Sequence, residues 1–327
     1  MKVFLSGFGV VGQATAQMLA ASSAELSEKH GLVPRIVGAA DKKGAALFPN
    51  GIDAAELLAR KRDRGTVADG SGLSVLAAVE ESDADVVVES APTDLADPHP
   101  AIERLQAAFR TGKHAVCVNK APLAIAMPSL LELAEYNKVI FRFSGTVGGG
   151  TPVLDWAMRA AEGDRIERVR AILNGTTNYM LTRMGTGVSY DAALAEAQEK
   201  GYAETDPSMD VDGVDAGIKL VILANAVMGR RVTISDVSIK GIRGLSVKGS
   251  VRLICEIGDS ISVAPREVEA GSPLLVTGTL NCVQLSLRNC GDSALIGKGA
   301  GGKETATSIV RDLITIWHRK WEGALPS

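Results

Sequence analysis

Long apolar runs are missing from this sequence. Gly, Asp, Lys or Arg interrupts every hydrophobic segment before it reaches the roughly 18 to 20 residues that a membrane-spanning helix needs. The glycines at positions 7, 9 and 12 also break the first apolar segment too early for a secretory signal peptide. We therefore expect a chain that is neither inserted in a membrane nor secreted.

Large blocks of like charge and closely spaced cysteines are missing as well. The longest basic run is the trio at positions 60–62 and the formal net charge is -3, so the chain offers no charged surface suited to nucleic acid or to an anionic membrane. The cysteines show no CxxC spacing, which argues against a zinc site and a disulfide framework. Their usage predicts reduced thiols in the cytoplasm. The four cysteines are Cys117, Cys255, Cys282 and Cys290.

The sequence is long enough for two domains, since it has 327 residues. Of these, 46% are hydrophobic and 22% are charged, a balance typical of a folded globular protein. In the first part, short Val- and Ile-rich runs alternate with amphipathic stretches, the order typical of βαβ units. The runs are almost continuously apolar, which predicts an α/β fold with a Rossmann-type, doubly wound parallel sheet covered on both faces. The predicted strands are 3–6, 36–39, 86–89 and 115–118, and the predicted helices include 13–21 and 102–109.

A different pattern follows position 122 or so. A predicted helix and strand lead into a glycine-rich segment, then into longer helices and a series of strand-like pieces separated by turn residues, which together predict a second, α+β domain. A last helix follows the glycines at 297–302. We place the first domain at 1–128 with 301–327 and the second at 129–300. The predicted elements are helix 130–136, strand 139–143, helices 190–200 and 211–228, and strands 251–257, 261–263 and 280–287.

Gly7, Gly9 and Gly12 form a GxGxxG motif directly after the first predicted strand and before a helix. Its glycines permit a tight turn, the approach of a pyrophosphate, and close packing of helix on strand, with the helix N-terminus directed at the anion. A purely structural glycine turn is the alternative, which the strand-turn-helix context disfavours. Together with Val10 and Val11, this motif predicts a dinucleotide site.

The second predicted strand ends at Asp41, where such folds place an acid for the ribose hydroxyls of NAD. Lys42 and Lys43 follow at once, and the basic trio Arg60, Lys61 and Arg62 comes soon after; all five could bind the extra phosphate of NADP. These basic residues could equally be solvated surface charges. The cofactor is therefore NAD or NADP, with a preference for NADP.

Asp215 and Lys219 are four residues apart in a predicted helix, so both side chains project from one face. An ordinary helix ion pair is the alternative interpretation. Two features favour a site: five acids lie between positions 204 and 215, and an apolar run follows Lys219. A buried lysine beside a carboxylate can exchange a proton with an alcohol.

Three segments carry a family resemblance: VNKAPLA at 118–124, ILNGTTNYMLTRM at 172–184, and EAQEKGYAETDPSMDVDGVDAGIKL at 196–220. With them, the chain resembles homoserine dehydrogenase over most of its length. The resemblance implies reversible hydride transfer between L-homoserine and L-aspartate 4-semialdehyde with NAD(P), in the biosynthesis of threonine and methionine. It also implies a second domain that binds the substrate and forms a homodimer.

The resemblance assigns roles to individual residues. It makes Lys219 the proton donor and acceptor, with Asp215 orienting substrate and lysine, and it places Lys120 near both cofactor and substrate, although Lys120 could also be an ordinary loop lysine. Glu204 would bind the ammonium group of the amino acid. The remaining substrate neighbours are Tyr202, Gly175 and Thr176, and the remaining nucleotide neighbours are Ser90, Ala91 and Gly301.

The chain departs from the family pattern at two places. The family holds a sodium ion through carbonyls here matched by Val147, Gly149 and Thr151, helped by a glutamate whose place Ser144 takes, so a sodium site would be weaker. The stretch between positions 240 and 251 looks short and predicts a lost helix. These departures leave two alternatives: a related dehydrogenase of another small hydroxy-amino acid or hydroxy acid, or a non-catalytic nucleotide-binding homologue. No ACT regulatory domain is expected after residue 317.

Overall fold

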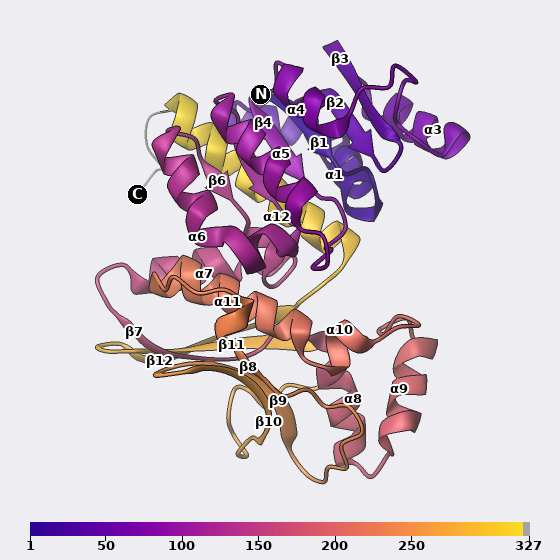
Figure 1. Cartoon of the computed structure of the whole chain (residues 1–327). Helices are drawn as coiled ribbons and strands as arrows, with labels where there is room; N and C mark the ends of the chain where they lie inside the picture. Colours follow the sequence, from indigo (N-terminus) through magenta and orange to yellow (C-terminus); the bar gives the residue numbers. More distant parts are fainter. Residues whose placement is uncertain (323–327) are drawn as a thin grey trace. The chain divides into compact units, whose positions relative to one another are not determined.

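The computed structural model describes residues 1–322, which form two compact units. The first unit comprises residues 1–146 together with the C-terminal helix that begins after Gly301, and the second comprises residues 147–300 (Figure 1). Among the described residues, no helix has both the length and the apolar character needed to cross a membrane.

The first unit contains a six-stranded sheet in the order β3-β2-β1-β4-β5-β6. All neighbouring strands are parallel except β3, which pairs antiparallel with β2. This is the predicted Rossmann-type arrangement, with β1 at its centre between β2 and β4. The strands are β1 Lys2–Ser6, β2 Arg35–Asp41, β3 Gly44–Ile52, β4 Val86–Glu89, β5 His114–Cys117 and β6 Phe141–Arg142.

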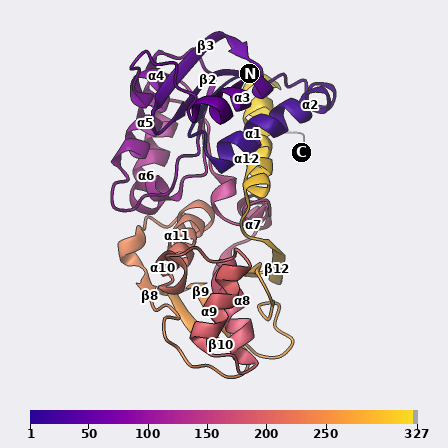
Figure 2. The ribbon, with the colours of Figure 1, turned by 90° about the vertical axis from the view of Figure 1, so that its right-hand side faces the viewer.

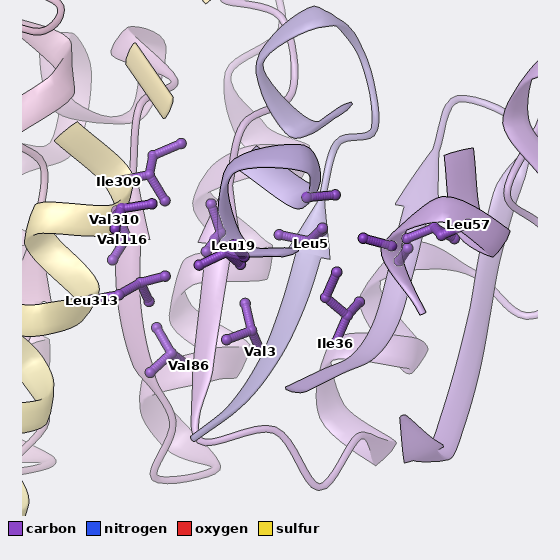
Figure 3. Close-up of a cluster of buried hydrophobic side chains, with 14 of the residues drawn as sticks. Val3, Leu5, Leu19, Ile36, Leu57, Val86, Val116, Ile309, Val310 and Leu313 are labelled. Carbon is purple, nitrogen blue, oxygen red and sulfur yellow. The ribbon is translucent and has the colours of Figure 1, made fainter. Parts of the chain in front are cut away.

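Side chains alternate across β1, and both faces are buried, as the near-continuous apolar runs predicted. Val3 and Leu5 join a cluster with residues of α1, α3 and α12, which Figure 3 shows, while Phe4 packs on the opposite face against α4 and α5 residues. The helices are α1 Val10–Ala21, α2 Ser23–His30, α3 Ala54–Arg64, α4 Val75–Glu81, α5 His99–Arg110, α6 Lys120–Tyr136 and α12 Gly302–Trp317.

The C-terminal helix α12 returns to the first unit and packs beside α1, although the two are separated by nearly the whole sequence (Figures 1 and 2). Its buried residues Ile309 and Leu313 complete the cluster that contains β1. Each fully buried side chain of this kind contributes about 1.5–3 kcal/mol to the hydrophobic free energy of folding. The described part of α12 thus belongs to the first unit, where the sequence analysis placed the residues from 301 onward.

The boundary at residue 128 is wrong, because the first unit continues to Thr146. Residues 129–136 complete α6, and β6 then adds a parallel strand beside β5. The Phe141 ring of β6 meets Phe109 of α5 edge-on, with ring centroids 5.1 Å apart, so this half-buried strand packs against the first unit's own core. The sequence pattern changes at residue 122, whereas the packing changes only after β6.

The second unit contains a six-stranded sheet in the order β12-β11-β7-β9-β10-β8. Its neighbours are antiparallel apart from the short β8, which pairs in parallel with β10. It is the α+β unit that the sequence predicted. The strands are β7 Ile166–Ile172, β8 Ser238–Ile239, β9 Val251–Ile257, β10 Ile261–Glu267, β11 Leu280–Leu287 and β12 Gly291–Lys298.

Helices α7, α8 and α11 pack on strands of this sheet, and α9 lies beside α8 (Figure 2). Helix α11 is almost entirely buried from its first turn to Asn225, which matches its largely apolar sequence. Residues 240–250 form turns and irregular structure, in agreement with the predicted loss of a helix there. The helices are α7 Val153–Ala161, α8 Gly175–Gly185, α9 Tyr190–Glu199, α10 Ser208–Val211 and α11 Val214–Met228.

Candidate active site

The first unit contains a cavity of about 600 Å³ at the carboxyl ends of β1, β2 and β4. Open α/β sheets bind ligands at this edge, and the volume suits a nucleotide. The lining includes seven residues that the sequence predicted for the cofactor: Gly7, Gly9, Asp41, Lys42, Lys43, Lys61 and Ala91. It also includes Arg104 of α5, which no sequence motif indicated.

The glycine turn leaves free space beside Gly9, where a ligand could approach the backbone. Gly7 has a φ of +106°, and a Cβ there would lie 2.5 Å from the backbone nitrogen of Ala91. A Cβ on Gly12 would lie 2.1 Å from the carbonyl oxygen of Gly7, whereas a Cβ on Gly9 would meet nothing within 4 Å. Helix α1 begins at the next residue with no side chain capping its N-terminus, so its first N–H groups can bind a phosphate.

Ser90 stabilises this turn, since its hydroxyl donates a hydrogen bond to the carbonyl oxygen of Gly7 at 2.8 Å. Other predicted nucleotide neighbours lie outside the cavity lining. Val10 is 76% exposed at the start of α1, with Val11 next to it. Gly301 precedes α12, and a Cβ on the adjacent Gly302 would come within 2.7 Å of Val10. The N-termini of α1 and α12 are therefore close neighbours.

Asp41 is already engaged by protein donors. Its carboxylate accepts hydrogen bonds from the Lys61 ammonium at 2.6 Å, the Thr66 hydroxyl at 2.9 Å, and the backbone N–H groups of Lys43 and Val67 at 2.9 and 3.0 Å. Burial alone would raise the pKa of Asp41, but these hydrogen bonds outweigh burial and lower it. A carboxylate with four donors has little acceptor capacity left for a ribose diol.

Of the basic trio at positions 60–62, only Lys61 lines the cavity. Arg60 lies over the Phe48 ring with its guanidinium carbon 5.1 Å from the centroid, and Arg62 pairs with Asp63 at 2.8 Å. Arg60 and Arg62 therefore lie outside the cavity lining and have other partners. Spacing could not separate them from Lys61, because the three point to different sides of α3.

Lys120 is the first residue of α6 and not a loop residue. The side chain of the preceding Asn119 caps this helix by accepting from the N–H of Ala121 at 3.1 Å. Lys120 therefore follows β5 at the carboxyl edge of the sheet, where the sequence predicted it, and its backbone N–H donates to the Thr93 hydroxyl at 3.3 Å. It is half-buried and lies outside the lining of the nucleotide cavity.

The second unit contains a separate buried polar network around Asp215 and Lys219. The Lys219 ammonium lies 2.7 Å from the Asp215 carboxylate and donates to the carbonyl oxygen of Leu173, also at 2.7 Å. Asp215 and Lys219 are only 8% and 6% exposed. The two residues do form an i, i+4 ion pair, and both are buried, unlike most helix ion pairs.

Two members of this network were missing from the predicted site, Asn174 and Asp210. The side-chain nitrogen of Asn174 donates to Asp210 at 2.6 Å and to Asp215 at 3.0 Å, while its oxygen caps α8 by accepting from the N–H of Thr177 at 2.9 Å. Burial raises the pKa of Asp210, partly offset by the hydrogen bond from Asn174. The signals were present, because Asn174 opens NGTTNY just before a helix and Asp210 belongs to the acidic run.

The predicted substrate neighbours surround the start of α8. A Cβ on Gly175 would lie 2.8 Å from the carbonyl oxygen of Thr279, and the Thr176 hydroxyl donates to the carbonyl oxygen of Tyr202 at 2.7 Å. The Tyr202 side chain is 44% exposed. Glu204 is exposed, and its backbone carbonyl oxygen accepts from the side chain of Gln198 at 3.0 Å. Glu204 thus lies outside the buried network.

The predicted sodium ligands Val147, Gly149 and Thr151 precede α7. Thr151 lines a cavity of about 10 Å³, the size of one water molecule or small ion. Asn281 also lines it, and both polar atoms of this buried amide are without a hydrogen-bond partner among the described residues. These oxygen donors suit a hard cation, but the three predicted residues supply no carboxylate. The sodium site stays a prediction.

The glycine turn gives a direct test. Gly9→Ala should fold normally, because its Cβ meets no atom of the protein, yet it should weaken NAD(P) binding by tenfold or more, because the methyl group occupies the space of the pyrophosphate. Gly12→Ala should instead destabilise the fold by about 1–3 kcal/mol through its clash with Gly7. Calorimetric titration and thermal unfolding would measure the two effects. Unchanged nucleotide affinity in Gly9→Ala would contradict this assignment.

Two protein-family models match this sequence, and both describe homoserine dehydrogenase. A family model described as homoserine dehydrogenase, NAD binding domain, matches residues 7–144, and a model described as homoserine dehydrogenase matches residues 152–314. The first range lies within the first unit, whereas the second covers most of the second unit and continues into α12, which belongs to the first unit.

Individual relatives match over the whole chain. The homoserine dehydrogenase of Methanocaldococcus jannaschii is 37% identical, with 97% of this chain and 99% of the relative covered. An NAD(+)-dependent homoserine dehydrogenase of Pseudomonas canavaninivorans is 35% identical, with 96% of each covered. The structure of a hyperthermophilic archaeal homoserine dehydrogenase in complex with NADPH superposes with a TM-score of 0.86 at 30% identity, covering 97% of this chain and 98% of that one.

Proposed function

This chain belongs to the homoserine dehydrogenase family, and from that premise we propose how its residues carry out the reaction. It is an NAD(P)-dependent oxidoreductase that acts on the CH–OH group of homoserine. The two alternatives, a dehydrogenase of another hydroxy acid and a non-catalytic nucleotide-binding homologue, are not favoured by any of these relatives.

Oxidation of L-homoserine removes a hydride from the alcohol carbon and a proton from the alcohol oxygen, which leaves the aldehyde of L-aspartate 4-semialdehyde. The bound NAD(P)+ supplies the hydride acceptor. We assign the proton to Lys219, whose neutral amine accepts it from the hydroxyl and whose ammonium form returns it to the carbonyl oxygen in the reverse reaction. The observation that carries this assignment is the buried contact between Lys219 and Asp215, 2.7 Å long.

Asp215 and Asn174 would position this lysine. Asp215 holds the ammonium on one side and the carbonyl oxygen of Leu173 holds it on another, so the direction of the third N–H is fixed. Asn174 fixes Asp215 in turn and links it to Asp210. A proton donor held in one orientation loses little entropy when the substrate arrives, which favours the transition state.

The remaining predicted contacts are proposals of the same kind. Lys120 would bind near the substrate and the nicotinamide, and Glu204 would bind the substrate ammonium. Backbone and side-chain groups of Gly175, Thr176 and Tyr202 would line the amino-acid site. The carbonyls of Val147, Gly149 and Thr151 would hold a sodium ion that orders their loop and takes no part in the proton transfer.

Lys219→Arg separates catalysis from folding. Arginine keeps the positive charge that Asp215 requires, but it does not deprotonate and so cannot accept the alcohol proton. We expect the rate of NAD(P)+ reduction with L-homoserine at alkaline pH to fall by a factor of about 10² to 10⁴, with the midpoint of thermal unfolding and the nucleotide affinity close to those of the parent protein.

Lys200→Arg serves as the matched control, because Lys200 is an exposed residue at the end of α9 in the same unit. It should leave the rate unchanged. Full activity in Lys219→Arg would exclude Lys219 as the proton donor and acceptor.

We further propose that this protein prefers NADP to NAD. Asp41, the residue that would bind a free ribose diol, is neutralised by Lys61, while Lys42 and Lys43 are exposed at the same wall of the cavity. Three lysines beside a saturated carboxylate suit a 2′-phosphate better than a hydroxyl pair.

Lys61→Met should reverse this preference, because it removes a phosphate partner and frees Asp41 to accept from the ribose. The ratio of kcat/KM for NADP+ to that for NAD+ should fall by about tenfold or more. Arg62→Met, on the same helix but paired with Asp63, is the control and should keep the ratio of the parent protein. A parent enzyme faster with NAD+, or an unchanged ratio in Lys61→Met, would contradict the proposal.

We propose that the protein is a cytoplasmic homodimer formed through the second unit. The edge strand β12 carries Ile296, which is 49% exposed, and soluble enzymes most often bury such strands across a twofold axis. Light scattering should give about twice the chain mass of 34.1 kDa. A mass near that of one chain at micromolar concentration would rule the dimer out.

A further inference from the structure

The carboxylate of Glu89 lies at the end of β4 with no exposed surface and joins several elements of the first unit. It accepts from the hydroxyl of Ser6 at 2.7 Å, from the backbone N–H of Ala91 at 3.2 Å and from the side chain of Asn119 at 3.4 Å. Arg104 of α5 completes the set with two hydrogen bonds, from Nε at 2.8 Å and from Nη2 at 3.0 Å. Every one of these partners lies at or next to the carboxyl edge of the sheet.

Arg104 also reaches the wall of the nucleotide cavity. Its side chain is 13% exposed, so the guanidinium is mostly buried and only part of it faces the cavity. A guanidinium has five N–H donors, of which Glu89 receives two, so the outer nitrogen retains donors for a ligand. The two-point pairing fixes the plane of the group, which a lysine could not do.

The order of the strands places Arg104 relative to the nucleotide. Asp41 and the adenosine end belong to β2, on one side of β1, while Ala91 and Pro92 follow β4, on the other side. The glycine turn between them binds the pyrophosphate. Arg104 lines the cavity together with Ala91 and Pro92, so it lies toward the nicotinamide half.

We propose that Arg104 is a nucleotide-binding residue that donates from its outer guanidinium nitrogen to the phosphate on the nicotinamide side, and that Glu89 is the positioning residue that holds it there. A buried ion pair contributes little net stability by itself and is often replaceable by apolar residues. In a pair that also binds an anion, both charges have a role: the guanidinium donates to the anion, and the carboxylate holds the guanidinium in place. This contact is independent of the proton transfer assigned to Lys219.

Truncated nucleotides test the proposal, because ADP-ribose carries both phosphates whereas 5′-AMP lacks the one on the nicotinamide side. Arg104→Lys keeps the charge opposite Glu89 but removes the fork. By calorimetric titration it should bind ADP-ribose and NADPH about tenfold more weakly, with 5′-AMP affinity unchanged. In steady-state assays the KM for the nucleotide should rise about tenfold, while kcat and the KM for homoserine stay within about twofold.

A double variant guards against a loss of folding, because it leaves no buried charge unpaired. Glu89→Gln with Arg104→Gln removes both buried charges and keeps their approximate shapes, and it should show the same selective loss of ADP-ribose binding. Glu89→Gln alone should weaken ADP-ribose binding by a few-fold without affecting 5′-AMP, since the guanidinium remains but is less well fixed. Arg110→Lys, at the exposed end of α5, is the matched control and should bind every nucleotide like the parent protein.

The outcomes separate clearly. Selective weakening of ADP-ribose in Arg104→Lys and in the double variant supports the proposal. Parent-like ADP-ribose affinity in either folded variant would overturn it and leave Arg104 as a structural partner of Glu89. An equal loss for 5′-AMP and ADP-ribose would also overturn it, because a general distortion of the glycine turn would then account for the effect.

Discussion

The nucleotide-binding edge of this protein depends on a close approach between backbone segments that only glycine allows. A Cβ on Gly12 would lie only 2.1 Å from the carbonyl oxygen of Gly7. Gly7 itself lies against the backbone of Ser90 and Ala91. Because nothing larger separates them, β1, α1 and the segment after β4 converge on one point. The uncapped N–H groups of α1 then face the cavity, and the hydroxyl of Ser90 completes the turn. The sheet and its flanking helices hold these segments at that distance.

The second recurring feature is that buried charges are fixed before any ligand arrives. Lys61 and backbone N–H groups hold Asp41, Arg104 holds Glu89, and Lys219 holds Asp215. Burying a charge costs free energy unless it is paired and hydrogen-bonded, so each of these sites is maintained at some expense to stability. For the proposed roles the gain is electrostatic preorganisation: the groups proposed to donate to phosphate in the first unit and the group proposed to donate a proton in the second have defined directions in the folded state.

Much of the architecture could be predicted because it depends on local sequence order. The four predicted parallel strands, the helix after GxGxxG and the long apolar helix α11 all follow from periodicity and turn residues. The strands β3 and β7 were not predicted, since β3 contains Pro49 and Gly51, and in β7 the consecutive charged residues Glu167 and Arg168 interrupt the apolar pattern. The domain boundary was misplaced because β6 is assigned to its sheet by packing on Phe109, a contact that no local pattern reveals.

By itself the sequence determined the glycine turn, the spacing of Asp215 and Lys219 on one helix face, and the motifs that carry the family resemblance, because all of these are encoded within a few turns of chain. Only the tertiary structure decided which charges meet. These contacts join residues that are distant in the sequence. Lys61 pairs with Asp41, Asn174 links Asp210 to Asp215, and Arg104 reaches the nucleotide cavity. Such pairings depend on which side of each helix packs on the sheet, and periodicity defines a buried face without naming the partner across it.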